Sequence, residues 1–185
     1  MNRRLCLDVS VFVGLVSLAF VTRLVMLAPN FHAVTAAALF AGFYFRNRLV
    51  AALVPLAAMA TSDWIIGGYV REVMFTVYGM MVLPIVCRGL LRRHLTAGRL
   101  TVCAVASTLL FYLATNAAVW HAGIWYKRGW DGLLACYTAG LPFLANALAG
   151  DLAFSAAFFG AYALACQLNT ERASAPIGMA TPDCA

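Results

Sequence analysis

The sequence predicts an all-α integral membrane protein, a bundle of six transmembrane helices with both termini in the cytoplasm. Hydrophobic residues make up 64% of the 185 positions and charged residues 11%, whereas a typical soluble domain carries about 25% charged residues. The few charges lie between long apolar runs. An uneven distribution of Lys and Arg over the segments between these runs predicts the orientation.

Six apolar runs are predicted as spans of a single domain over residues 1–170. Their approximate limits are 9–27, 32–45, 49–66, 70–91, 100–122 and 142–168. The first run follows Arg3 and Arg4 like a signal peptide, but it continues past Arg23 without a small-x-small cleavage site, so we interpret it as a retained span. The second run is short and the third contains Pro55, which a helix covered by its neighbours tolerates.

The last run combines small residues with two polar ones. As a helix it would extend roughly 40 Å, and it contains Asn146 and the single charge Asp151. Alanine recurs every four residues, at 145, 149, 153, 157, 161 and 165. Small residues let membrane helices approach closely, so this row is predicted to pack against another helix. Residues 171–185 are small and polar, which predicts a flexible C-terminal tail.

The orientation follows from thirteen basic residues. With the N-terminus inside, the inner segments hold Arg3, Arg4, Arg46, Arg48, Arg88, Arg92, Arg93, Arg99 and Arg172, and the outer segments hold Arg23, Arg71, Lys127 and Arg128. This excess favours cytoplasmic termini. The outer side then includes all four tryptophans and a long aromatic connection, 123–140, part of which is expected to form a short interfacial helix.

Several classes of function lack their motifs. The sequence contains no GxSxG, no Gly-rich phosphate loop and no HxxxH or HExxH spacing. The six cysteines form no CxxC pair and lie mostly in apolar runs, where free thiols are expected. Membrane orientation accounts for the net charge of +6 without a nucleic-acid partner. We therefore expect no enzyme activity, cofactor, metal or nucleic-acid partner.

Eight residues are candidates for contact with a ligand: His32, Asp63, Tyr69, Asn116, Trp120, Trp125, Asn146 and Asp151. An acid in an apolar span is costly unless it is paired or hydrated. Asp63 therefore either faces an outward cavity, caps the next turn or pairs with Arg71. Asp151 either contacts a ligand, binds a proton, or joins Asn116 and Asn146 in a polar cluster that holds helices together.

The histidine and the tryptophans have simpler interpretations as well. His32 follows the first outer loop and is either a polar interface residue or a ligand contact. Tryptophans near a membrane surface ordinarily form the aromatic belt, and the alternative is a stacking surface for a flat organic ligand.

Several segments resemble known vitamin transporters. RLVMLAPNFHAVTAAALFAGFYF and PLAAMATSDWIIG resemble S-components, the substrate-binding subunits of energy-coupling-factor transporters. TNAAVWHAG with GLLACYTAGLPFLANALAGDLAFSAAFFG is similar to a BtuM-like group of bacterial membrane proteins. The resemblance covers roughly residues 10–168 and implies a six-helix bundle of the inner membrane that binds a vitamin, with cobalamin as the leading candidate. It implies ligand contacts at His32 and Asp63, and also at Tyr69 and Tyr78.

Two features depart from that pattern. The AxxxA motif that docks a coupling subunit is missing from the first helix, where Ala19 is followed by Arg23, and a small-residue ladder lies instead on the second helix, at Ala33, Ala37 and Ala41. Partnership with a coupling subunit and its ATPases is therefore only an alternative here. The outer end of the fourth span has Met74, Phe75 and Thr76, so cobalt ligation by a cysteine is not expected there.

The sequence thus predicts a substrate-binding membrane protein for uptake of a vitamin or similar micronutrient, with its ligand in an outward-facing cavity. One alternative is a membrane-embedded enzyme that acts on a lipid or vitamin through Asp63, Asp151 and a histidine. Another is a structural or assembly protein in which the polar residues only hold helices together.

Overall fold

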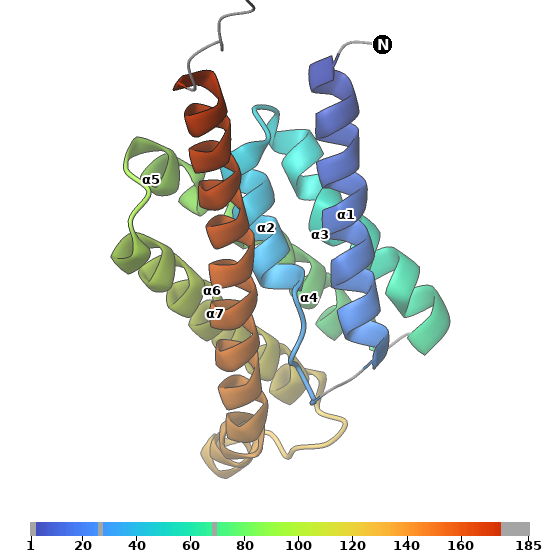
Figure 1. The fold of residues 1–185 in the computed structure, drawn as a ribbon. Helices are drawn as coiled ribbons and strands as arrows, with labels where there is room; N and C mark the ends of the chain where they lie inside the picture. The colour runs from blue at the N-terminus through green and yellow to red at the C-terminus, as the bar shows by residue number, and fades with distance from the viewer. Residues whose placement is uncertain (1–2, 26–27, 68–69, 175–185) are drawn as a thin grey trace, which may run out of the picture.

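The computed structural model describes residues 3–25, 28–67 and 70–174, and every regular element in them is a helix (Figure 1). The elements are α1 (Arg3–Val25), α2 (Val34–Tyr44), α3 (Arg48–Ile66), α4 (Arg71–Val82), the 3₁₀-helix η1 (Leu83–Cys87), α5 (Arg88–Arg93), α6 (Ala97–Ala122) and α7 (Trp130–Ser174). Pro84 lies in η1, and its missing N–H explains why the helix tightens there.

Within the described residues, five stretches are long and apolar enough to cross a membrane. They are Arg4–Val25, Arg48–Ile66, Arg71–Arg93, Ala97–Ala122 and Trp130–Leu168. Large apolar side chains on their outer faces are exposed, among them Val13, Leu53 and Leu110, as expected for surfaces covered by lipid. The fold is therefore compatible with a multi-pass membrane bundle. α1 begins and α7 ends at the same end of the bundle (Figure 1).

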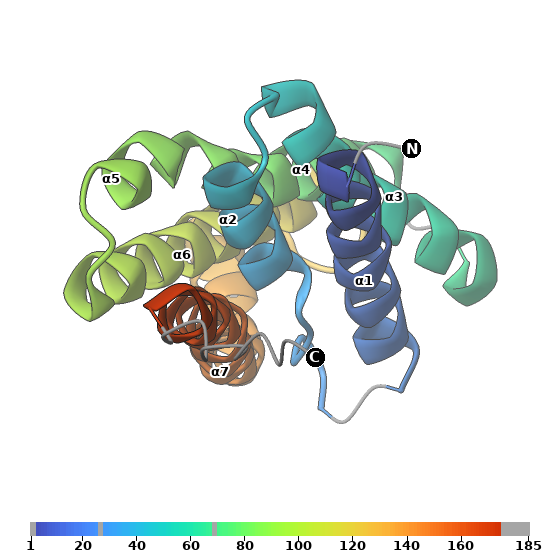
Figure 2. The same cartoon turned by 45° about the horizontal axis from the view of Figure 1, so that its top comes forward.

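The short helix α2 lies at the centre of the bundle (Figure 2). It packs against α1, α3, α6 and α7, and its residues from Val34 to Gly42 are buried. Its eleven residues extend only about 16 Å, roughly half of the 30 Å hydrocarbon core of a bilayer. The small-residue ladder of Ala33, Ala37 and Ala41 is fully buried, so other helices of the same chain already cover it.

Arginines from α5 complete the C-terminal end of α2. The Arg92 guanidinium donates to the carbonyl oxygens of Phe43 at 2.7 Å, Tyr44 at 3.1 Å and Phe45 at 2.8 Å. Arg88 donates to the carbonyl of Arg46 at 3.0 Å. A helix end exposes unpaired carbonyls with partial negative charge, so these cations, which the sequence analysis used only to predict orientation, also have a structural role.

The segment before α2 is held on both sides. The Ala33 N–H donates to Thr22 Oγ1 of α1 at 3.1 Å, and Asn146 of α7 donates through Nδ2 to the Pro29 carbonyl at 3.0 Å. At Gly150 a Cβ would lie 3.3 Å from the His32 backbone nitrogen, so the glycine permits close packing of α7 against this segment. We call residues 28–33 the entry loop of α2.

Two sequence expectations for the C-terminal half are corrected. The 123–140 segment does contain a helix, but it is continuous with the last span, since α7 begins at Trp130. Hydrogen bonds to α6 hold these first turns: Tyr137 Oη donates to the Leu113 carbonyl at 2.7 Å, and Tyr112 Oη donates to the Tyr137 carbonyl at 2.5 Å. Residues 171–174 are helical rather than part of a tail; residues 175–185 lie outside the described residues.

The alanine row of α7, which the sequence predicts to pack against another helix, is not covered by any helix in the described part of the chain. The alanines at 145, 149, 153, 157, 161 and 165 are all exposed. The buried row is Ala147, Asp151, Ser155 and Phe159, which has the same spacing of four. Aromatic contacts explain the choice, because Phe159 and Tyr162 pack on the Phe40 ring of α2.

The contacts of Arg92 with the C-terminal end of α2 lead to a prediction about stability. Arg92→Gln removes the cation from three carbonyls, and we expect it to lower the free energy of unfolding by about 1–2 kcal/mol. Thermal unfolding in mild detergent measures this change. Arg93→Gln is the control, because Arg93 is an exposed neighbour in the same helix. Equal effects of the two substitutions would contradict the capping role.

Candidate functional site

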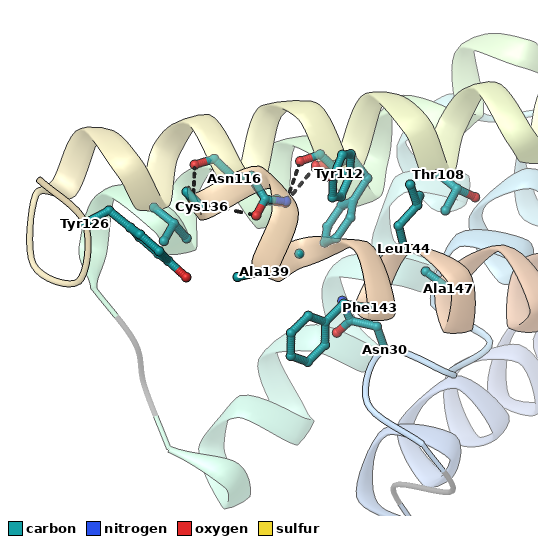
Figure 3. Close-up of a pocket in the computed structure, with 14 residues that line it drawn as sticks. Asn30, Thr108, Tyr112, Asn116, Tyr126, Cys136, Ala139, Phe143, Leu144 and Ala147 are labelled. Atoms are coloured by element: carbon teal, nitrogen blue, oxygen red, sulfur yellow. Dashed lines mark hydrogen bonds between the residues drawn. The ribbon is translucent and has the colours of Figure 1, made fainter. Parts of the chain in front are cut away.

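A cavity of about 270 Å³ lies between α6 and the first half of α7 (Figure 3). We call it the Asn116 cavity. Its lining residues are Asn30, Thr108, Phe111, Tyr112, Thr115, Asn116, Val119, Tyr126, Cys136, Ala139, Gly140, Phe143, Leu144 and Ala147. The combination of aromatic walls with a few polar groups is typical of small-molecule sites.

A polar row on α6 forms one wall of this cavity. Thr108, Tyr112, Thr115 and Asn116 follow one another at helical spacing and therefore share a face. α7 can approach this wall closely because residue 140 is glycine. A Cβ there would lie 2.6 Å from Asn116 Oδ1 and 2.9 Å from a ring carbon of Tyr112.

The Asn116 side chain is only partly used by the protein. Its Nδ2 donates to the Tyr112 carbonyl at 2.8 Å. From the described residues, its Oδ1 receives a single long contact, at 3.8 Å from the Cys136 thiol, which also lies 3.4 Å from the Asn116 carbonyl. Figure 3 shows both groups at the cavity wall. A ligand N–H or O–H could therefore bind to Asn116 Oδ1, which can accept two hydrogen bonds.

A second cavity, of about 170 Å³, surrounds the entry loop. It is lined by Thr22, Arg23, Ala28, Pro29, Asn30, Phe31, His32 and Ile66, and we call it the His32 cavity. Asn30 lines both cavities and has a left-handed backbone, with φ of 63°, a conformation that asparagine tolerates better than most residues.

His32 is held neutral in this second cavity. Burial and the nearby charge of Arg23 lower the pKa of His32 from 6.5 to about 4. The His32 Nδ1 atom is buried and has no hydrogen-bond partner among the described residues.

Asp63 pairs with Arg23, not with Arg71. Arg23 Nη2 lies 2.8 Å from Asp63 Oδ1, and Tyr78 Oη donates to Asp63 Oδ2 at 2.8 Å. Arg23 also donates through Nη1 to Ser62 Oγ at 2.6 Å. The pair connects α1, α3 and α4, and its two side chains are only 13% and 11% exposed, so it has a clear structural role.

Asn116, Asn146 and Asp151 do not form the single cluster considered for them. Asn116 bonds within α6 and Asn146 bonds to the entry loop. The Asp151 carboxylate lies 2.6 Å from Thr108 Oγ1 at the base of the Asn116 cavity. Asn146 and Asp151 differ by five positions, which points them to different sides of α7.

Two further candidates, Trp120 and Trp125, do not line the Asn116 cavity. Trp125 is 60% exposed, as expected for an aromatic belt, while Trp120 is half-buried and its Nε1 has no partner in the described part of the chain. Tyr69 lies outside the described residues. Among the residues described, no three His, Cys, Asp or Glu side chains lie close enough to bind a metal.

Sequence reasoning missed Thr108 and Tyr112 in the cavity wall and Arg23 as the partner of Asp63. Thr108 and Tyr112 were detectable in principle, because they extend Asn116 into a polar row at helical spacing. The Arg23–Asp63 pair joins residues forty positions apart on different helices, and no spacing rule identifies such a contact.

Comparison with known proteins places the chain in a family. The model of DUF6580, a family of unknown function, matches residues 4–174, so the chain belongs to this family. No curated protein and no solved structure matches the chain.

A double-mutant cycle tests the structural role of Asp63. Asp63→Ala leaves the Arg23 charge unpaired, and we expect a loss of about 3 kcal/mol in unfolding free energy. Combining it with Arg23→Ala should cost at least about 1 kcal/mol less than the sum of the single changes. Thermal unfolding of all four proteins gives the coupling. Arg71→Ala is the matched control, and its change in unfolding free energy should simply add to that of Asp63→Ala. Coupling of Asp63 to Arg71 instead of Arg23 would contradict the pairing.

The pKa of His32 predicts an acid-dependent loss of stability. The unfolded chain binds a proton near pH 6.5, whereas the folded chain binds it only near pH 4. The contribution of neutral His32 to the free energy of unfolding is therefore fully present above about pH 6.5, and it falls as the pH is lowered toward 4. The full difference corresponds to about 3 kcal/mol.

The free energy of unfolding, measured from pH 7.5 to 4, should depend less on pH for His32→Gln than for the natural protein. His121→Gln, at the exposed end of α6, is the control and should retain the steep curve. A His32→Gln curve as steep as that of the natural protein would show that another group causes the acid sensitivity.

Proposed function

We propose that this DUF6580 member is a membrane protein that binds a vitamin or similar micronutrient for uptake, with the ligand in the Asn116 cavity. The observation that supports this most directly is the cavity itself. Polar groups of Asn30, Asn116 and Tyr126 lie around its wall, and the apolar faces of Phe111 and Phe143 complete it. A ligand with one ring and a few hydrogen-bonding groups matches this lining.

The size of the cavity favours a small ligand. Sites for drug-sized molecules enclose about 300–1,000 Å³, and the Asn116 cavity, at about 270 Å³, lies just below this range. Cobalamin is larger than most drug molecules and would require the helices to separate. A smaller micronutrient is therefore the better candidate, although the resemblance to vitamin transporters first suggested cobalamin.

The charge distribution supports outward access. The arginines around Arg46, Arg88 and Arg92 lie at the end of the bundle where α2 ends, and the Asn116 cavity lies toward the opposite end, near the 123–129 connection. With the basic end in the cytoplasm of a bacterial inner membrane, the cavity faces the outside. A coupling subunit, if used, would dock on an exposed helix face, because the ladder of α2 is buried.

The enzyme alternative gains no support from the arrangement. Asp63 pairs with Arg23 and Asp151 contacts Thr108, so the two acids belong to separate hydrogen-bonding groups. The alternative of a structural or assembly protein predicts that no ligand fills the Asn116 cavity, so a binding experiment distinguishes it from the proposal.

Native mass spectrometry of the protein in nanodiscs, after incubation with a mixture of vitamins, tests the proposal. We expect one small vitamin to bind and to raise thermal stability. Asn116→Ala should weaken this binding about 10-fold, because a buried hydrogen bond contributes about 1–2 kcal/mol. Ala139→Leu should abolish binding by filling the cavity.

Ala145→Leu is the matched control, because Ala145 is an exposed alanine of the same helix that does not line the cavity. It should bind as the natural protein does. Absence of any bound vitamin, or equal binding by the Ala139 and Ala145 variants, would overturn the proposal.

A further inference from the structure

The contact between α6 and α7 carries a second hollow besides the Asn116 cavity. This one, of about 400 Å³, is lined by Leu95, Thr96, Ala97, Leu100, Thr101, Ala104, Leu152, Ser155, Ala156, Phe159, Gly160 and Ala163. We call it the Ser155 groove. The Asn116 cavity and the Ser155 groove therefore follow one helix pair, toward opposite ends of the bundle.

Asp151 and Thr108 lie between these two spaces. On α7, Ala147 lines the Asn116 cavity and Ser155 lines the Ser155 groove, and Asp151 is one turn from each. On α6, Thr108 lines the cavity and Ala104, one turn away, lines the groove. The contact of Asp151 Oδ2 with Thr108 Oγ1, at 2.6 Å, therefore forms the partition.

In the part of the chain that the structure describes, no cation pairs with the Asp151 carboxyl group. It is 3% exposed, and no Lys, Arg or His of the described residues forms an ion pair with it. α2 presents the Thr35 hydroxyl to it and α6 presents Thr108. Along the sequence of α6, the ionisable residues nearest to Thr108 are Cys103 and Tyr112. From the entry loop the nearest is His32, whose backbone nitrogen packs beside Gly150.

Thr108 can stabilise both protonation states of Asp151. Its Oγ1 lies 2.9 Å from the Ala104 carbonyl and 2.6 Å from the carboxyl group, but a hydroxyl has only one hydrogen to donate. When Asp151 is protonated, it can donate to Thr108, which donates to Ala104. When Asp151 is ionised, the Thr108 hydrogen turns to the carboxylate.

Ser155 supplies an independent observation on the groove side. Its side chain is 2% exposed, and its Oγ has no partner among the described residues. A buried hydroxyl without a hydrogen bond is costly, so this one requires a partner from the groove that it lines. It also lies on the same face of α7 as Asp151, one turn further along.

We propose that Asp151 is a proton-exchange site in the partition between the Asn116 cavity and the Ser155 groove. In the exchange the Asp151 O–H bond breaks, the proton passes to a water molecule, and the carboxylate takes the Thr108 hydroxyl hydrogen bond in return. Reprotonation from water reverses each step. The site does not depend on the identity of the ligand in the Asn116 cavity.

Infrared spectroscopy of the protein in nanodiscs over a series of pH values tests this proposal. We expect a carbonyl stretch from a protonated, buried carboxylic acid that disappears at high pH, is lost in Asp151→Asn and shifts in D₂O as water exchanges the proton. Asp63→Asn is the matched control and should retain the band, because Asp63 is paired with Arg23.

A second pair of variants keeps the test decisive if Asp151→Asn does not fold. Thr108→Val should shift the frequency of the band by removing a hydrogen-bond partner, whereas Thr115→Val, whose hydroxyl bonds to its own helix at Phe111, should not. The proposal is overturned if no protonated-acid band responds to either Asp151 or Thr108, or if the band persists unshifted in D₂O, which would make the pair a sealed structural contact.

Discussion

The structure depends on how a helix of eleven residues is accommodated at the centre of a membrane bundle. In lipid, every unpaired backbone group must find a partner within the protein, and α2 is too short to place both of its ends in water. Arg92 binds three carbonyls at its C-terminal end. Thr22 accepts from Ala33 at the other end, and Asn146 binds the entry loop.

This central helix also organises the candidate sites. The entry loop that leads into α2 separates the Asn116 cavity from the His32 cavity, with Asn30 lining both. α2 presents Thr35 to Asp151 and receives Phe159 of α7 on Phe40. A change at either end of α2 would therefore reach both the proposed ligand cavity and the partition below it.

Hydropathy was sufficient to predict the helical class and most helix positions, because a span is a property of a continuous segment. It could not choose between two rows of α7 with the same spacing, since Phe40 and its partners decide which row is buried. The early start of α7 depends on hydrogen bonds to α6, which follow from the packing of the two helices. Asn116 was found in the cavity wall, whereas Asn146 instead holds the entry loop.

Hydrogen–deuterium exchange of the protein in nanodiscs tests whether α2 is enclosed and whether the backbone groups at both of its ends have partners within the protein. Amides of an enclosed element exchange only when the surrounding structure opens. We expect peptides covering Val34–Tyr44 to exchange among the slowest in the chain, although α2 is much shorter than the spanning helices. Exchange of these peptides as fast as that of the 123–129 connection would contradict it.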